Sequence, residues 1–343
     1  MPVTARFVST DGNGTGSVPN PLTSSNPADY VEVTADFGFS TNFQSTSPFL
    51  GVFEGTTYAA ISEENVGISP LGFYASPGFP GSPSNPRPGY VPNITTQLIQ
   101  QLYTTGYVSL AQFTGDWEQD GTNYVFAIGR NTDAGQRFAA YLETGFDKTS
   151  DVRVYFPTIG GSPVTVGNIT YGGTVTSQVP WPIAQQPGQL AVPLGSGGYN
   201  SGANLARVLT VTLTEPAYTL GGLLPDATAG YYVGYVTPGD ANNRILGLNN
   251  VVPLANRGVA LRLNGVELTT DNVKKGIYTA WPYNRLIRPQ GGVVGTDAAF
   301  KDDFADELRD QIAEVDAPAG GGIIDDATVK VKRDADGGAV IKK

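Results

Sequence analysis

The chain is most constrained by residues 124–143, where an apolar strand passes through a short polar turn directly into a helix. The strand, residues 124–129, ends at Arg130, and residues 138–143 are compatible with a helix. A helix start exposes unpaired backbone N–H groups and a partial positive charge, and an arginine presents a planar fork of donors. The pattern is therefore typical of an anion site, although it also occurs as plain structure.

The charge balance argues against two classes of partner. The formal net charge is -10 at pH 7, so the long-range field repels nucleic acid and anionic membranes. A local anion site is compatible with this charge, because Arg130 and a helix start act only at short range. Cation binding is the alternative use of so many carboxylates.

Histidine and cysteine are both absent. Their absence excludes Ser-His and Cys-His nucleophiles, disulfides, iron–sulfur clusters, and zinc or haem sites built on these residues. Carboxylate pairs of the glycosidase kind remain available, but none lies in an apolar context. We therefore expect a protein that is not an enzyme and that holds no metal and no cofactor.

The chain shows no targeting or membrane segment in this numbering. Residues 1–4 lack the basic and apolar stretches of a signal peptide, and no run of about 18 apolar residues occurs. With 44 Gly, 25 Pro and only 15% charged residues, the chain is rich in turns and strands. Its 343 residues suffice for two medium lobes with a sizeable core.

Several segments carry local predictions. Residues 9–29 predict a loop or arm, and the six prolines of residues 76–92 predict an extended, polyproline-like surface excursion. A helix is expected from residue 94 to residue 102, with Thr95 or Thr96 as its cap. Strands are expected at residues 152–156, 164–166, 174–179 and 208–213, with a helix as the alternative for residues 205–209.

The last part of the chain predicts a helix followed by a hairpin. Residues 300–315 form an amphipathic pattern with Phe304 on the apolar face. Residues 328–332 alternate as a strand, residues 336–338 read as a turn, and residues 339–341 read as a return strand.

Six motifs resemble, in the same order, those of the phosphate-binding proteins that serve ABC transporters, a PstS-like family of two-lobed solute-binding proteins. They lie at residues 36–41, 66–70, 130–136, 198–202, 233–236 and 276–283. The resemblance covers roughly residues 3 to 290. It implies a two-lobed periplasmic-binding-protein-like α/β fold, rich in strands and loops, with extended N- and C-terminal segments.

The resemblance also implies a domain division, a location and a function. The first lobe is residues 1–72 with 284–343, and the second lobe is residues 73–283. The function implied is non-catalytic binding of a phosphate-like oxyanion outside the cytoplasm, in an extracellular, cell-surface or periplasmic setting. The first strand of the family is missing, so a leader and a short N-terminal piece are expected to lie outside this numbering.

The ligand site implied by the resemblance draws on four segments. Departures from the family pattern lie at Ala134, Gln136 and Thr41, where the family has Ser, Thr and Asp. Two hydroxyl donors and one carboxylate are thereby lost, which implies an altered or weaker ligand. The implied ligand-binding residues are Thr15, Ser17, Ser40, Thr41, Arg130, Asp133, Gly135, Gln136, Asn200 and Ser201.

A self-assembling structural protein is the alternative interpretation, such as a filament, surface layer, sheath or virion component. In this interpretation a neighbouring subunit fills the missing strand position by β-augmentation. The donated strand is the N-terminal arm or the C-terminal tail, and the apolar tail residues are Val329, Val331, Val340 and Ile341.

Overall fold

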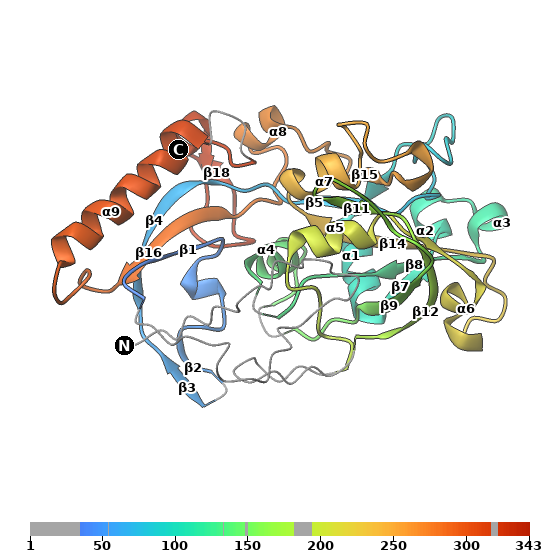
Figure 1. Cartoon of the computed structure of the whole chain (residues 1–343), viewed down its shortest axis with the longest axis horizontal. Helices are drawn as coiled ribbons and strands as arrows, with labels where there is room; N and C mark the ends of the chain where they lie inside the picture. The colour runs from blue at the N-terminus through green and yellow to red at the C-terminus, as the bar shows by residue number, and fades with distance from the viewer. Residues whose placement is uncertain (1–34, 54, 133, 148–149, 182–193, 317–321) are drawn as a thin grey trace.

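The computed structural model describes residues 35–343 except residues 54, 133, 148–149, 182–193 and 317–321. The described part is a mixed α/β structure with two main sheets, which confirms the α/β class predicted from the sequence. The larger sheet and most helices occupy one side of the molecule, and the smaller sheet with the long helix α9 occupies the other (Figure 1). The predicted arm at residues 9–29 lies outside the described residues.

The large sheet contains six strands in the order β6-β15-β5-β14-β8-β7. Its strand β14 pairs in parallel with β8 and antiparallel with β5. Phe126 of β8 and Tyr232 and Tyr235 of β14 are fully buried, and Tyr103 and Leu205 from flanking helices join the same cluster. The core of the molecule therefore lies on this sheet. Its strands are β5 (Gly72–Ala75), β6 (Asn93–Ile94), β7 (Tyr107–Ser109), β8 (Asn123–Ala127), β14 (Ala229–Val236) and β15 (Val259–Leu263).

The small sheet contains three antiparallel strands in the order β1-β16-β4. Helix α9 lies along it (Figure 1), with Ala305 packed on Val66 and Leu286. The helix predicted at residues 300–315 is thereby confirmed, but Phe304, predicted for its apolar face, is 48% exposed. The elements are β1 (Gly38–Ser40), β4 (Ile61–Ile68), β16 (Tyr283–Pro289), α9 (Ala298–Asp310) and the π-helical turn Gln311–Asp316.

The chain crosses between the two sheets twice, and the two crossings lie side by side. The backbone N–H of Ser69 donates to the Pro282 carbonyl at 3.0 Å, and the N–H of Leu71 donates to the Ala280 carbonyl at 2.8 Å. These bonds continue the β4–β16 pairing toward the large sheet. The segments predicted as crossings, residues 66–70 and 276–283, are therefore neighbours in space.

The remaining strands form one three-stranded sheet and three hairpins. The sheet has the order β13-β12-β9, and the hairpins pair β2 with β3, β10 with β11 and β17 with β18. These strands are β2 (Gly51–Phe53), β3 (Thr56–Tyr58), β9 (Tyr155–Gly160), β10 (Val164–Val166), β11 (Ile169–Tyr171), β12 (Thr174–Pro180), β13 (Thr212–Leu213), β17 (Val331–Lys332) and β18 (Ile341–Lys342).

The helices other than α9 are short, and none of the helices in the described residues is long and apolar enough to cross a membrane. The Thr95 hydroxyl accepts from the N–H of Leu98 at 3.1 Å, which confirms the predicted cap of the first helix. The helices other than α9 are α1 (Thr96–Thr105), α2 (Ala111–Thr114), α3 (Trp117–Asp120), α4 (Gly135–Glu143), α5 (Gly202–Val208), α6 (Glu215–Tyr218), α7 (Pro238–Arg244) and α8 (Thr270–Lys274).

Two predictions of local structure are wrong. Residues 76–92 form consecutive hydrogen-bonded turns rather than an extended excursion, because buried Phe79 fixes the start of the segment in the core. Residues 208–213 form a strand only at Thr212–Leu213, because α5 continues through Val208, as the helical alternative for residues 205–209 predicts. In addition, the strand expected at residues 152–156 begins only at Tyr155.

Candidate functional site

The turn after β8 is held in place by the chain near Tyr199. The N–H of Asn131 donates to the Tyr199 carbonyl at 3.0 Å, and the N–H of Tyr199 donates to the Gly129 carbonyl at 2.8 Å. The N–H of Arg130 donates to the Tyr235 hydroxyl at 3.2 Å, which ties the turn to the core of the large sheet. Burial raises the pKa of Tyr235, and nearby Arg137 partly opposes this shift.

Within the described part of the chain, the half-buried side chain of Arg130 donates to three oxygens. Its Nε donates to the Tyr199 carbonyl at 2.9 Å, and its Nη2 donates to the Asn200 carbonyl at 3.1 Å. Its Nη1 donates to Oε1 of the Gln136 side chain at 2.5 Å. The carbonyl bonds fix the guanidinium, whereas the Gln136 amide ends a flexible side chain that an oxyanion can replace.

Helix α4 begins without a side-chain cap. Its N-cap residue is Ala134, which cannot accept from the first-turn N–H groups, whereas Ser201 caps α5 through its hydroxyl. A first turn without a cap offers backbone donors and the positive end of the helix dipole. The N–H of Arg137 donates to the Ala134 carbonyl at 2.9 Å, and the N–H groups of Gly135 and Gln136 precede it in the same turn, whose Gln136 side chain contacts Arg130.

The loop after β1 closes over this first turn. A Cβ atom placed on Gly135 would lie 2.0 Å from Oγ1 of Thr41 and 2.5 Å from Oδ1 of Asn42. Only glycine leaves room for this approach, because real Cβ contacts are not that short. Thr41 from the small-sheet side and α4 from the large-sheet side therefore meet at Gly135.

A carboxylate also lies near the turn. A Cβ on Gly202 would lie 2.1 Å from Oδ2 of Asp240 and 3.3 Å from Oε1 of Gln136. Asp240 is thus a partly exposed negative charge near the Gln136 amide, and it also accepts from the Thr237 hydroxyl at 3.3 Å and pairs with Arg244 at 3.9 Å. It opposes an incoming anion, and more strongly one that carries two charges.

Sequence reasoning missed Arg137. Its side chain is buried, and its Nη1 donates to the Ser196 carbonyl at 2.7 Å and to the Gly197 carbonyl at 3.1 Å. Its Nη2 donates to the Ser196 hydroxyl at 3.0 Å, and its guanidinium lies over the Tyr141 ring. The role of Arg137 is to bind the chain at Ser196 and Gly197 from inside the protein. In the sequence, the only signal for this role was a cation next to Phe138 at the start of an apolar helix face.

The structure brings together part of the predicted site. Thr41, Arg130, Gly135 and Gln136 meet at the first turn of α4, and Asn200 contributes its carbonyl. The other described members have local roles: the Ser40 hydroxyl accepts from the N–H of Asn42, the Asn200 side chain accepts from Asn204, and Ser201 caps α5. The three predicted residues that lie outside the described residues are Thr15, Ser17 and Asp133.

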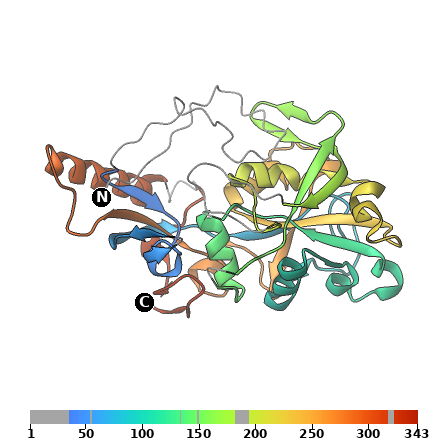
Figure 2. The same ribbon diagram turned by 90° about the horizontal axis from the view of Figure 1, so that it is seen from below.

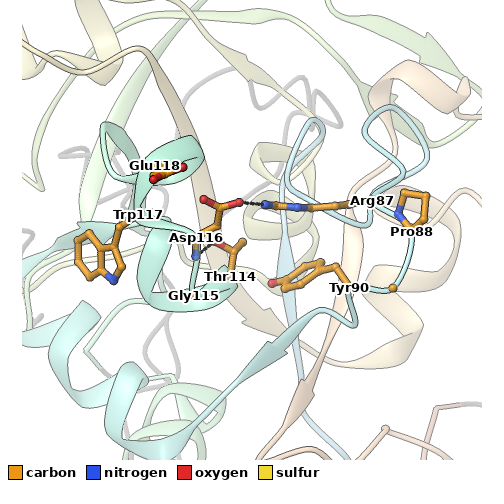
Figure 3. Close-up of a pocket in the computed structure, with 9 residues that line it drawn as sticks. Arg87, Pro88, Tyr90, Thr114, Gly115, Asp116, Trp117 and Glu118 are labelled. Carbon is orange, nitrogen blue, oxygen red and sulfur yellow. Dashed lines mark hydrogen bonds and ion pairs between the residues drawn. The ribbon is translucent and has the colours of Figure 1, made fainter.

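A surface groove of about 630 Å³ lies elsewhere, next to α2 and α3 (Figure 3). Arg87 enters it, but its guanidinium is bound by Asp116 at 2.7 Å and by Asp120 at 2.5 Å. The exposed ring of Trp117 points away from Arg87 (Figure 3). The polar groups around Arg87 therefore bind one another, and among the described residues no group of three or more acidic side chains is placed to hold a metal ion.

No protein-family model and no curated protein matches the chain. Among solved structures, an ABC-type phosphate transport receptor from Vibrio cholerae is 12% identical, with 85% of this chain and 80% of that chain covered and a TM-score of 0.43. A putative phosphate ABC transporter substrate-binding protein from Clostridium perfringens, solved with bound phosphate, is 12% identical, with 85% and 79% covered and a TM-score of 0.42. PstS from Borrelia burgdorferi is 11% identical, with 77% and 72% covered and a TM-score of 0.36.

These structural neighbours belong to the class that the sequence motifs resemble, at low identity and low TM-score. A likeness of this degree carries no statement about a ligand. The function has to follow from the residues of the site.

Proposed function

We propose that the protein is a non-catalytic binding protein for a small oxyanion, with its site at the first turn of α4. The observation that carries the proposal is the uncapped start of α4 beside the half-buried guanidinium of Arg130. Both features supply donors to an anion, and an anion that displaces the Gln136 amide would accept from Arg130 Nη1 and from the N–H groups of Gly135 and Gln136.

The site lies where two proposed lobes meet. We infer a first lobe of residues 1–72 with 284–343, around the small sheet, and a second lobe of residues 73–283, around the large sheet. The chain crosses between the sheets near these boundaries, and Thr41 and Gly135 approach one another from the two sides. A ligand held between two lobes is shielded from water, which strengthens its hydrogen bonds.

The ligand preferred by this site is a singly charged oxyanion. Asp240 places a negative charge beside Gln136, and Ala134 and Gln136 supply no hydroxyl donors. Each charge-assisted bond that is absent removes about 1.5–3 kcal/mol, so binding is expected to be weaker than at a fully equipped phosphate site. An extracytoplasmic setting for this binding function belongs to the same proposal.

Isothermal titration calorimetry with inorganic phosphate, sulfate and nitrate tests the proposal. We expect measurable binding of phosphate, tightest at acidic pH where the monoanion prevails, and its loss in Arg130→Met. Arg262→Met is the matched control, because Arg262 lies on the surface in an exposed pair with Glu267. Absence of heat with all three anions in the unmodified chain would refute the proposal.

A second candidate function is self-assembly, and one observation favours it. β1 is one of the two edge strands of the small sheet among the described residues, and three exposed phenylalanines lie near it. Phe300 and Phe304 stack with centroids 6.3 Å apart, and Phe37 bridges Phe304 to Phe39 through edge contacts. Exposed aromatic surface beside an open edge is typical of a contact between subunits.

The C-terminal tail is used within its own chain. Val329 is buried, and Val331 and Val340 pack against Gly276, while Ile341 is 45% exposed. β17 pairs antiparallel with β18, so a tail hairpin forms as predicted, but its strands are shorter than the predicted strands at residues 328–332 and 339–341. Assembly through the tail stays a prediction, and the phenylalanines near β1 are the better-exposed surface for it.

A further inference from the structure

The turn of the C-terminal hairpin binds the loop that follows β1. Oδ2 of Asp336 accepts from Nδ2 of Asn42 at 3.2 Å, from the backbone N–H of Phe43 at 3.0 Å and from the Thr46 hydroxyl at 2.5 Å. Asp336 is buried, so these three donors act without competition from water. One carboxylate oxygen thus organises residues 42–46.

That loop is itself fixed to the small sheet. The N–H of Gln44 donates to the Glu63 carboxylate of β4 at 2.7 Å, and the ring of Phe43 lies 3.9 Å from the Arg285 guanidinium of β16. The loop moves with the small sheet, because both of its anchors are sheet residues. Asp336 therefore connects the hairpin to the small-sheet side of the molecule.

The same hairpin also holds the far end of α4. Arg333 Nη1 lies 2.8 Å from the carboxylate of Glu143, the last residue of α4, in a pair whose side chains are 2% and 11% exposed. Arg333 Nη2 donates to the Thr279 carbonyl at 2.8 Å, and the guanidinium lies 4.2 Å from the centre of the Trp281 ring. Helix α4 packs on the core of the large sheet through Tyr141, so the hairpin is also connected to the large-sheet side of the molecule.

Backbone packing leaves the hairpin little room to shift. A Cβ on Gly337 would lie 2.3 Å from the Leu142 carbonyl, and one on Gly276 would lie 2.9 Å from Val331 and Val340. In Figure 2 the red C-terminal segment lies beside the blue loop after β1 and the green helix α4. Both ends of α4 are thus held, the first turn by Thr41 and the last by Arg333.

We propose that the C-terminal hairpin is a strap that fixes the two sheets relative to one another, and that Asp336 is a positioning residue that holds Thr41 against the first turn of α4. The strap acts whether or not an anion binds. Its effect on affinity rests on the proposed function, because only then does the placement of Thr41 contribute to a ligand.

Distance measurements between paired spin labels test the strap directly. The chain contains no cysteine, so Ser45→Cys in the loop and Gln101→Cys in α1 give one labelled pair across the two sides. We expect a single narrow distance distribution that broadens in Asp336→Ala. Asp334→Ala is the matched control, because Asp334 is an exposed aspartate two residues away in the same turn.

Two further variants keep the test decisive if Asp336→Ala folds poorly. Asp336→Asn retains one oxygen that accepts from the N–H of Phe43, so it should restore most of the narrow distribution. Arg333→Met releases the other anchor of the strap and should broaden the distribution as Asp336→Ala does. An unchanged distribution in both Asp336→Ala and Arg333→Met would overturn the strap.

Calorimetry with inorganic phosphate separates the strap from the binding proposal. Loss of the ordered Thr41 contact in Asp336→Ala should weaken phosphate about tenfold, with recovery in Asp336→Asn and no change in Asp334→Ala. If the unmodified chain binds none of phosphate, sulfate and nitrate, the binding proposal fails while the spin-label result still decides the strap. If phosphate binds equally well to Asp336→Ala, the positioning role of Asp336 is refuted.

Discussion

The two main sheets of this protein are stabilised in different ways. The large sheet buries aromatic side chains such as Phe126, Tyr232 and Tyr235 completely. The small sheet shares with α9 a cluster whose buried members are Val66, Leu286 and Ala305. Ion pairs also join this sheet to the helix, from Arg288 to Asp302 and Asp306. The comparison shows that the large sheet depends on apolar burial, whereas the contact between the small sheet and α9 depends largely on charge, so the two should respond to different perturbations.

Removing a core aromatic from the large sheet should have the largest effect. Phe126→Ala deletes a fully buried ring that contacts Tyr155 and Tyr232, and such a deletion costs about 3–5 kcal/mol of the free energy of unfolding. Chemical denaturation followed by tryptophan fluorescence measures the loss. Leu286→Ala in the small sheet is the comparison variant, with an expected cost near the lower limit of about 2 kcal/mol for leucine, because the small cluster around it can collapse. Equal costs for the two variants would contradict the comparison.

The ion network is the corresponding weak point of the small sheet. Arg288 of β16 pairs with Glu64 of β4 at 2.8 Å and with Asp306 of α9, and Arg309 pairs with Glu64 and Asp306 at 2.8 Å each. The carboxylates are partly exposed, so Arg288→Met should cost only about 1–2 kcal/mol. The cost should shrink in high salt, because exposed pairs are screened. Denaturation at low and high salt measures this, and a loss independent of salt would show that packing rather than charge holds α9.

Some features of this fold could be predicted from the sequence, and others could not. The strand before Arg130, the helix after it, the capped α1, the α9 helix and the tail hairpin were all predictable, because each depends on local pattern. The contacts of Thr41 with Gly135 and of Asp336 with Phe43 were not, because they join segments far apart in the chain. The turns at residues 76–92 were missed for a related reason: the burial of Phe79 is a tertiary contact that overrides the local preference of proline.

The pKa values of two carboxylates, Asp306 in α9 and Asp336 in the C-terminal hairpin, are shifted in opposite directions. Hydrogen bonding from Arg288 lowers the pKa of Asp306, so its contribution to stability is present above the ordinary aspartate value of 3.8 and is lost as pH falls through the lowered pKa. Burial raises the pKa of Asp336, and bonds from Thr46 and the nearby charge of Arg333 oppose the shift. The contribution of Asp336 to stability is therefore fully present below pH 3.8, and it is lost as pH rises through the raised pKa of this group.

Stability measured as a function of pH checks this pair of signs. Asp306→Asn should flatten the loss of stability below pH 3.8, and Asp336→Asn should flatten the change between 3.8 and neutrality. Glu143, whose pKa burial also raises, lies near Asp336 and will leave a residual slope in the second variant. Identical profiles for the two variants would show that the carboxylates do not report on separate parts of the molecule.

The smallest expected effect is on an exposed aromatic of the small sheet. Phe304 is 48% exposed and stacks on Phe300, which is 69% exposed, so Phe304→Ser should change the free energy of unfolding by no more than about 0.5 kcal/mol. In a monomer the ring packs on Phe300 and Phe37, which are not buried core residues, so its loss leaves the buried core intact. Sedimentation of the unmodified chain and of Phe304→Ser at equal concentration measures assembly. If the unmodified chain assembles and the variant stays monomeric, the ring contributes to a contact between subunits. If both chains sediment as monomers, the exposed aromatics do not drive assembly. Of the aromatic residues compared, only those in the core of the large sheet would then have a measurable effect, which is on the free energy of unfolding.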